Sequence, residues 1–290
     1  MFTGSYTALV TPFKGGKVDE AAFAKFINWQ IEQGTHGLVP CGTTGESPTL
    51  NHDEHNRVIE LCVKVAAKRV PVIAGTGSNA TYEAIAITQK AEKSGADGAL
   101  IVVPYYNKPT PEGLFQHFKA IHDETNIPII LYNVPGRTVI DMQNDLIARL
   151  AELPRIVGIK DATGKLERVK DLASKVRRDF IQLSGEDDTA AEFNKEGGQG
   201  VITVSANVAP KLVAEVQNAT LKGDWKKAKE LQDKLMPLHK IMFCETSPGP
   251  VKYAVSLLGF CREEMRLPLV PPREENKKKI RQVMETLELI

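Results

Sequence analysis

Short apolar runs rich in β-branched residues recur along the chain with segments of helical spacing between them, and this alternation constrains the fold most. The runs lack the polar alternation of strands with one wet face, so they predict parallel strands buried on both sides. Eight such runs in about 200 residues predict an α/β fold of the (β/α)8 barrel type. An open, doubly wound sheet is the alternative, because a single sequence does not establish closure. The runs occupy residues 6–13, 37–43, 71–77, 98–106, 128–136, 156–163, 180–187 and 200–207.

Beyond residue 220 the pattern becomes purely helical. Helices are expected near residues 224–241, 248–258 and 273–288. No Gly/Ser-rich linker precedes them. The sequence therefore predicts a catalytic barrel over residues 1–223 and a C-terminal helical extension over residues 224–290.

Composition and charge argue against several classes of function. The 290 residues include 37 basic and 36 acidic side chains spread along the chain, which predicts no basic surface for nucleic acid or an anionic membrane. No apolar run approaches the roughly 20 residues of a membrane helix, and the N-terminus lacks the pattern of a signal peptide. We therefore expect a cytoplasmic protein with no nucleic-acid or membrane partner.

The run "IVGIKDAT" (156–163) ends a predicted strand in a lysine. Alternation along the strand predicts that Ile156, Gly158 and Lys160 face the barrel interior, with Gly158 leaving space beneath the lysine, while the intervening side chains face the helices. A buried ammonium needs an anion or a lowered pKa. Lys160 is therefore either held in a structural ion pair or is an amine nucleophile that forms a Schiff base with a carbonyl substrate.

Two further groups fall at the C-terminal ends of predicted strands, where barrel enzymes carry their active sites. Tyr132 ends the strand before the lysine strand, so its hydroxyl can move protons near the lysine, or it fills the core as tyrosine often does. In "GTTGES", Thr43 and Thr44 stand on a Gly-flanked turn whose N–H groups can hold a carboxylate or can begin a helix.

The motifs "VGIKDAT", "YNVPGRT", "CGTTGES" and "PYYNKPT" resemble those of the dihydrodipicolinate synthase (4-hydroxy-tetrahydrodipicolinate synthase) family, among the pyruvate-dependent class I aldolases. The resemblance extends over essentially the whole chain. It implies that Lys160 forms the Schiff base with pyruvate and that Tyr132, Thr44 and Tyr106 form a proton relay. It also implies that Tyr106 reaches the neighbouring subunit's site across a tight dimer interface, within a homotetramer built as a dimer of dimers.

The same resemblance implies the substrates. Arg137 would bind the carboxylate of L-aspartate-4-semialdehyde, and Thr43, Gly185 and Ile202 would line the pyruvate pocket, with no metal or organic cofactor. The product would enter diaminopimelate and lysine biosynthesis. Two alternatives stay open, an aldolase that cleaves a 2-oxo sugar acid and a non-catalytic barrel that binds a keto acid as a regulator. The Thr-Thr pair and the arginine favour the synthase.

Family members inhibited by L-lysine bind it in a pocket at the dimer interface. Pro48 replaces the commoner alanine there. Tyr105 and Tyr106 would face opposite ways on an extended segment and so connect this pocket with the active site. The equivalent residues in this chain are Ser47, Pro48, His52, His55, Asn79, Glu83 and Tyr105.

Two patterns point to other chemistry but lack its context. "AGTGSNA" (74–80) matches a dinucleotide fingerprint, yet Asp97 precedes the next strand instead of ending it and would lie at the wrong edge for a ribose. His52 and His55 are spaced to share a metal, but no third ligand is evident. Neither a nicotinamide nor a metal site is expected.

Overall fold

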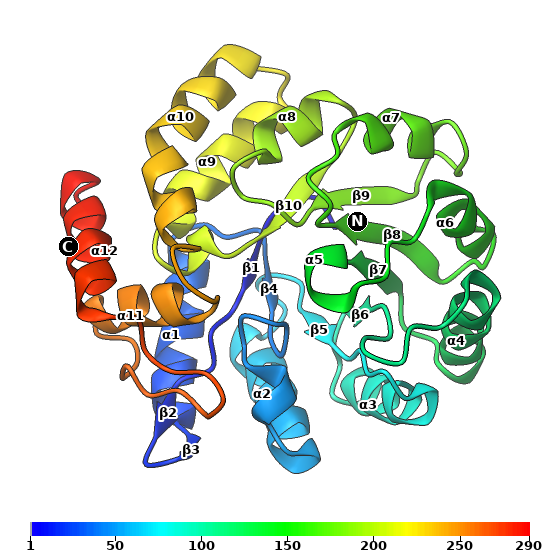
Figure 1. The fold of residues 1–290 in the computed structure, drawn as a ribbon, viewed down its shortest axis with the longest axis horizontal. Helices are drawn as coiled ribbons and strands as arrows, with labels where there is room; N and C mark the ends of the chain where they lie inside the picture. The colour runs from blue at the N-terminus through cyan, green and yellow to red at the C-terminus, as the bar shows by residue number, and fades with distance from the viewer. Residues whose placement is uncertain (1) are drawn as a thin grey trace.

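The computed structural model describes residues 2–290, and its centre is a closed barrel of eight parallel strands (Figure 1). The strands follow the order β4, β1, β10, β9, β8, β7, β6, β5, and a parallel bridge between Leu38 and Val72 links the two ends of that order. The barrel prediction is therefore confirmed and the open sheet is excluded. The strands are β1 (Gly4–Ala8), β4 (Gly37–Val39), β5 (Ile73–Gly75), β6 (Gly98–Val102), β7 (Ile129–Asn133), β8 (Ile156–Asp161), β9 (Ile181–Ser184) and β10 (Gly200–Thr203).

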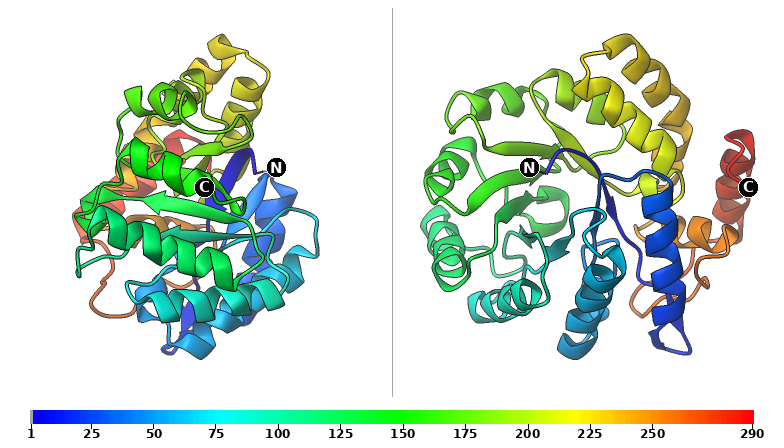
Figure 2. Two further views of the ribbon diagram at one scale, coloured as in Figure 1. Left: turned by 90° about the vertical axis from the view of Figure 1, so that its right-hand side faces the viewer. Right: turned by 180° about the vertical axis from the view of Figure 1, so that it is seen from behind.

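Helices surround the barrel in a ring, as the right-hand view of Figure 2 shows. Local sequence signals fix several of their ends. Asn51 and Glu54 form a capping box at the start of α2, and Thr110 caps α4 with Pro111 in its first turn. The ring consists of α1 (Glu20–Glu32), α2 (His52–Ala66), α3 (Thr81–Lys93), α4 (Pro111–Glu124), α6 (Asn144–Ala151), α7 (Glu167–Ala173), α8 (Ala190–Lys195) and α9 (Pro210–Leu221).

Several short elements lie in the connections. A two-stranded hairpin of β2 (Phe13–Lys14) and β3 (Lys17–Val18) follows β1, and its short strands were not predicted. Two 3₁₀ turns, η1 (Ser47–Thr49) and η2 (Ser205–Asn207), and the single-turn helix α5 (Pro135–Thr138) follow barrel strands at their C-terminal ends.

The C-terminal extension contains α10 (Trp225–Ile241), α11 (Gly249–Leu257) and α12 (Glu274–Thr286). These bounds confirm the three predicted helices. Leu235, Val251 and Ile280 share one buried apolar cluster with Phe26 of α1 and Val213 of α9, so the extension packs directly on the barrel helices. A domain boundary at residue 223 stays a prediction.

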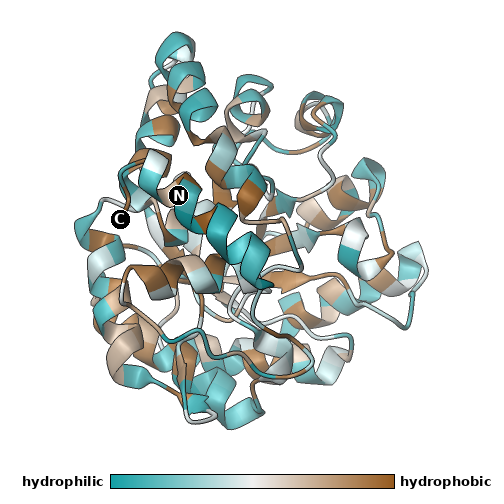
Figure 3. Cartoon of the chain, turned by 60° about the vertical axis from the view of Figure 1, so that its left-hand side comes forward, coloured by the Kyte–Doolittle hydropathy of each residue, from teal (hydrophilic) through white to brown (hydrophobic). Residues whose placement is uncertain are grey.

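Apolar side chains form separate layers inside the barrel and between strands and helices. Leu100, Ile130 and Leu183 belong to the interior layer, whereas Ile101 and Phe118 belong to a layer under the helices. Figure 3 shows the helices with bands of hydrophobic and hydrophilic residues, as expected for helices with one buried face.

A register shift at the start of β8 changes which side chains point inward. Ile129 pairs with Ile156, but the next residue of β7 pairs with Gly158. Ile156 therefore lies in the helix-side layer and Val157 in the interior layer, so the prediction for Ile156 was wrong. The predicted role of Gly158 was also wrong, because a Cβ there would lie 2.5 Å from the Ile181 carbonyl oxygen. The glycine admits the neighbouring strand, and it does not make room for the lysine.

Among residues 2–290, every helix is too short or too polar to cross a bilayer.

Candidate active site

Lys160 and Tyr132 lie side by side at the C-terminal ends of β8 and β7. They are paired across the two strands, and the Lys160 Nζ lies 4.3 Å from the centre of the Tyr132 ring. Only 7% of Lys160 and 8% of Tyr132 is exposed. Among residues 2–290 no carboxylate forms an ion pair with Lys160, so the structural ion pair considered from the sequence finds no partner.

A cavity of about 80 Å³ opens above this pair. Its walls come from the ends of several strands, from the loop after β4, from α5 and from the segment after α10. Of the residues proposed from the sequence for catalysis and substrate binding, the structure brings together Thr43, Thr44, Tyr132, Arg137, Lys160, Gly185 and Ile202 around this cavity.

Tyr106 is the exception. It does not line this cavity, and 91% of it is exposed. Its φ of +74° is in the left-handed region, which is uncommon for a residue with a bulky side chain. The segment is therefore not extended at Tyr106, and the prediction that Tyr105 and Tyr106 alternate as on a strand was wrong. Within one subunit the proposed relay is incomplete.

The loop that carries Thr43 and Thr44 is held in place by contacts with other parts of the chain. Thr44 is buried, and the Thr11 hydroxyl donates to the Gly45 carbonyl at 2.7 Å. Glu46 has a φ of +56° and forms a fully buried ion pair with Lys252 of α11. The C-terminal extension thus anchors the threonine loop.

Arg137 stands on α5 at the rim of the cavity. It is exposed, and its Nη2 donates to the Ser247 carbonyl at 3.4 Å. A guanidinium presents a planar fork of donors that matches a carboxylate. A substrate carboxylate can therefore bind at the rim while its reacting end extends down to Lys160.

Sequence reasoning missed several residues of the cavity wall, among them Glu186, Phe243 and Ser247. Burial raises the pKa of Glu186 to about 7, although the positive charge of Lys160 opposes the rise. Glu186 follows strand β9, and that strand-end position could have identified it. Phe243 and Ser247 come from the helical extension, where the sequence carried no signal of a site.

Comparison with known proteins bears on what this site does. The model of the dihydrodipicolinate synthetase family matches residues 1–287. The chain belongs to this family. A curated 4-hydroxy-tetrahydrodipicolinate synthase from Parvibaculum lavamentivorans is 59% identical over 290 residues, all of both chains.

Solved structures of this family are similar to the chain over its full length. The chloride-inhibited dihydrodipicolinate synthase of Acinetobacter baumannii, complexed with pyruvate, is 48% identical, with a TM-score of 0.98 over 100% of both chains. The Cyanidioschyzon merolae enzyme with lysine bound is 36% identical, with a TM-score of 0.96 over 100% of this chain and 99% of that one.

A second, larger cavity of about 410 Å³ adjoins the first and shares Thr43, Val134 and Arg137 with it. Asn79 lies outside its wall but donates to the Tyr105 carbonyl at 3.1 Å. The other six residues that the family resemblance assigned to a lysine site line it: Ser47, Pro48, His52, His55, Glu83 and Tyr105.

Glu83 is the acidic group of this second cavity. The Ser78 hydroxyl donates to its Oε2 at 2.7 Å, and His52 Nε2 lies 4.0 Å from its Oε1. Burial, aided by repulsion from His52, lowers the pKa of His55 to about 4, so His55 is neutral at physiological pH. Glu83 is the one carboxylate among the described residues that line this cavity, which also include Arg137, and it can pair with a ligand that carries an ammonium group.

Asp97 and the pair of His52 and His55 belong to the two other sequence patterns. The Asp97 carboxylate accepts from the Val72 N–H at 2.9 Å, before β5 and β6 begin, at the end of the barrel away from the cavity. Within residues 2–290, no cluster of three or more His, Cys, Asp or Glu side chains is arranged for a metal.

Proposed function

We propose that this protein is a 4-hydroxy-tetrahydrodipicolinate synthase, a lyase that condenses pyruvate with L-aspartate-4-semialdehyde through a Schiff base on Lys160. The observation that carries the proposal is the buried Lys160 amine beside Tyr132, without an ion-pair partner, at the base of a cavity. The name of the Parvibaculum relative and the pyruvate complex of the Acinetobacter relative support it.

In the first half of the reaction the Lys160 amine, in its deprotonated form, attacks C2 of pyruvate. Tyr132 supplies a proton to the carbonyl oxygen, the oxygen leaves as water, and an iminium forms. The iminium withdraws electrons from the adjacent methyl group, which loses a proton to the Tyr132 oxygen and gives an enamine. The N–H groups of the turn that carries Thr43 and Thr44 hold the pyruvate carboxylate.

In the second half the enamine carbon attacks the aldehyde carbon of the semialdehyde, and the new C–C bond leaves a hydroxyl group. Arg137 holds the carboxylate of this substrate at the rim. The substrate's own amine then displaces Lys160 from C2 and closes the ring. Two substrates thus give one 4-hydroxylated cyclic imine and one water, and the enzyme returns unchanged.

The relay from Tyr132 through Thr44 needs a third hydroxyl, which we assign to Tyr106 of a second subunit. The 91% exposure of Tyr106 fits a residue that is covered by a partner. We propose a homotetramer made of two such dimers, in the cytoplasm. L-Lysine, the end product of the diaminopimelate pathway, would inhibit from the second cavity, where Glu83 would bind an ammonium group.

A comparison of acceptor aldehydes tests the proposed substrate. Turnover of pyruvate is measured with L-aspartate-4-semialdehyde and with sugar aldehydes, for wild type and Arg137→Met. We expect kcat/KM to be at least ~100-fold higher for the semialdehyde, and Arg137→Met to remove most of that preference. Equal or better turnover of a sugar aldehyde would identify a sugar-acid aldolase instead.

A further inference from the structure

We propose that Arg168 is a positioning residue for the reaction, because it fixes the ends of β7 and β8 from the side opposite the cavity and thereby sets Tyr132 against Lys160. The proposal rests on the function proposed above. Arg168 acts within a group of four residues, which we call the strand-end clamp: Asn133, Asp141, Asp161 and Arg168.

On β8, Arg168 binds the residue that follows the lysine. Its Nε donates to Asp161 Oδ2 at 3.0 Å. The other carboxylate oxygen, Oδ1, accepts from the Thr163 N–H at 2.9 Å and from the Thr163 hydroxyl at 2.6 Å. Asp161 is therefore held on both oxygens, and it is the residue next to Lys160 on the strand.

On β7, the residue after Tyr132 is held just as firmly. Asn133 is fully buried, and its side-chain amide donates to Asp141 Oδ1 at 2.9 Å. Its side-chain oxygen accepts from the Met142 N–H at 3.0 Å. Both ends of the Asn133 amide are thus satisfied by the segment that follows α5.

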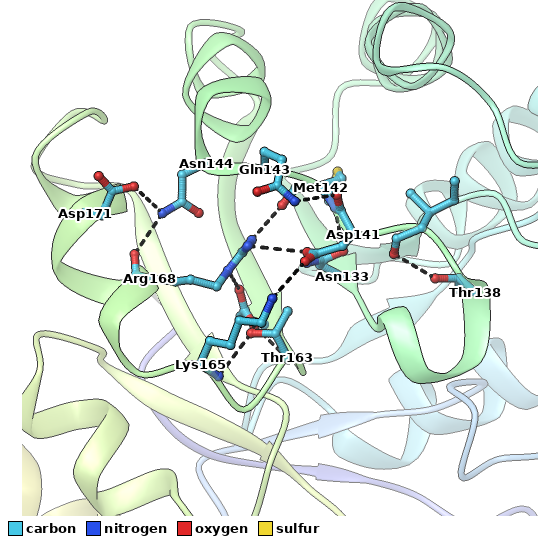
Figure 4. A network of polar contacts seen from close by, with 12 residues as sticks. Asn133, Thr138, Asp141, Met142, Gln143, Asn144, Thr163, Lys165, Arg168 and Asp171 are labelled. Atoms are coloured by element: carbon cyan, nitrogen blue, oxygen red, sulfur yellow. Dashed lines mark hydrogen bonds and ion pairs between the residues drawn. The ribbon is translucent and has the colours of Figure 1, made fainter.

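One guanidinium joins these two halves, and Figure 4 shows Arg168 beside Asp141 and Met142. Arg168 Nη2 donates to the Met142 carbonyl at 2.6 Å, and its Nη1 lies 3.4 Å from Asp141 Oδ1. Burial alone would raise the pKa of Asp141, but the Asn133 hydrogen bond and the charges of Arg168 and Lys165 outweigh it and lower that pKa. Asp141 therefore carries its negative charge at physiological pH.

The clamp holds the last pair of a regular ladder. Beyond the register shift between Ile129 and Ile130, β7 and β8 pair residue by residue up to Asn133 and Asp161, and the clamp binds both side chains of that last pair. Because side chains alternate along a strand, holding Asp161 and Asn133 outward turns Lys160 and Tyr132 inward. A displacement of about 1 Å between reacting groups can lower a rate by about 10²-fold.

The clamp could instead contribute only to stability, and the chain offers a matched control for that alternative. Arg177 Nη2 donates to the carbonyl of Ile156, the first residue of the same strand, at 2.7 Å, and its Nη1 donates to the Ala151 carbonyl. Like Arg168, it joins β8 to its surroundings by partly buried hydrogen bonds. It does so at the end away from Lys160.

The experiment compares Arg168→Met with Arg177→Met. For each variant and wild type we would measure kcat, KM for pyruvate, and both the rate constant and the final yield of the pyruvate adduct trapped with borohydride. We expect Arg168→Met to lower kcat and the adduct rate constant at least ~10-fold, with full final yield and KM within about threefold. Arg177→Met should keep both rates within about twofold of wild type.

Arg168→Lys is the second variant, since it keeps the charge near Asp161 but cannot also span Met142 and Asp141. We expect its kcat to lie between those of Arg168→Met and wild type. Rates of Arg168→Met equal to those of Arg177→Met, or a loss seen only as a lower yield of adduct, would overturn the proposal. If wild type itself forms no adduct, the proposed function fails, whereas an adduct in wild type with unaffected Arg168 variants removes the positioning role alone.

Discussion

At the scale of single residues, the Tyr132 hydroxyl is the group that the proposed reaction needs most after the lysine. Tyr132→Phe keeps the ring that lies 4.3 Å from the Lys160 Nζ and removes only the hydroxyl. We expect kcat to fall by about 10² to 10⁴-fold, the range for loss of a general acid–base group, with little change in stability. Steady-state assays with pyruvate and the semialdehyde measure this, and a loss below about tenfold would show that another group moves the proton.

Glu186 leads to a prediction about pH. Its pKa is 4.5 in an ordinary setting and about 7 in the folded protein, mainly because it is buried. Between these two values the unfolded chain has released a proton that the folded chain retains, so the side chain lowers stability progressively as pH rises from 4.5 to 7. Glu186→Gln cannot ionise and is spared this loss.

The stability advantage of Glu186→Gln over wild type should therefore grow by about 1 to 3 kcal/mol between pH 4 and pH 8, and level off above pH 7. Denaturant unfolding of both proteins across this range measures the difference. An advantage that is independent of pH would mean that Glu186 ionises normally in the folded protein.

At the scale of elements, the pair of Glu46 and Lys252 joins the threonine loop to α11 with both side chains fully buried. Removing one partner leaves a buried charge without compensation. Lys252→Met should lower the free energy of unfolding by about 3 to 5 kcal/mol, and Glu46→Gln together with Lys252→Met should recover part of that loss.

Chemical denaturation of the two single variants and the double variant measures the coupling. The exposed pair of Lys229 and Asp233 on α10 provides the control, since breaking it should change stability by less than about 1 kcal/mol. Equal losses of stability at the two pairs would contradict the proposal that the buried ion pair anchors the threonine loop to α11.

The sequence predicted the elements well wherever the period of the pattern was unambiguous. The eight strands and the three C-terminal helices lie where apolar runs and helical spacing placed them. Ile156 and Val157 were assigned to the wrong faces because of the register shift between β7 and β8. Such a shift depends on how the two strands pair, so it cannot be predicted from the sequence of one strand alone.

The site was only partly predictable for a similar reason. The sequence places Lys160, Tyr132 and the threonine turn at the C-terminal ends of strands. Their residue types and this position together indicate a catalytic site. Phe243 reaches the cavity from a segment far along the chain, and Arg168 acts through Asp161 from the outer side of the barrel. Tertiary packing alone reveals such roles.

At the scale of the whole molecule, the exposure of Tyr106 and its absence from the cavity of its own subunit predict that each active site is shared. Lys160→Ala and Tyr106→Phe subunits should both be poorly active alone. In a mixed dimer, one site would combine the intact Lys160 of one subunit with the intact Tyr106 of the other.

Co-expression of the two variants should therefore restore about a quarter of wild-type activity, since random pairing makes about half of the dimers mixed and each has one complete site of two. Activity of the separated mixed dimer measures this directly. Activity no greater than that of the two parents would mean that Tyr106 serves its own subunit or none.

The most direct test of the central claim is the intact mass of the protein after incubation with pyruvate and borohydride, for wild type and Lys160→Ala. Reduction of the iminium makes the Schiff base permanent, so wild type should gain one reduced pyruvyl group per subunit and the variant none. A wild-type mass that stays unchanged, or an adduct that persists in Lys160→Ala, would contradict the role of Lys160 as the nucleophile.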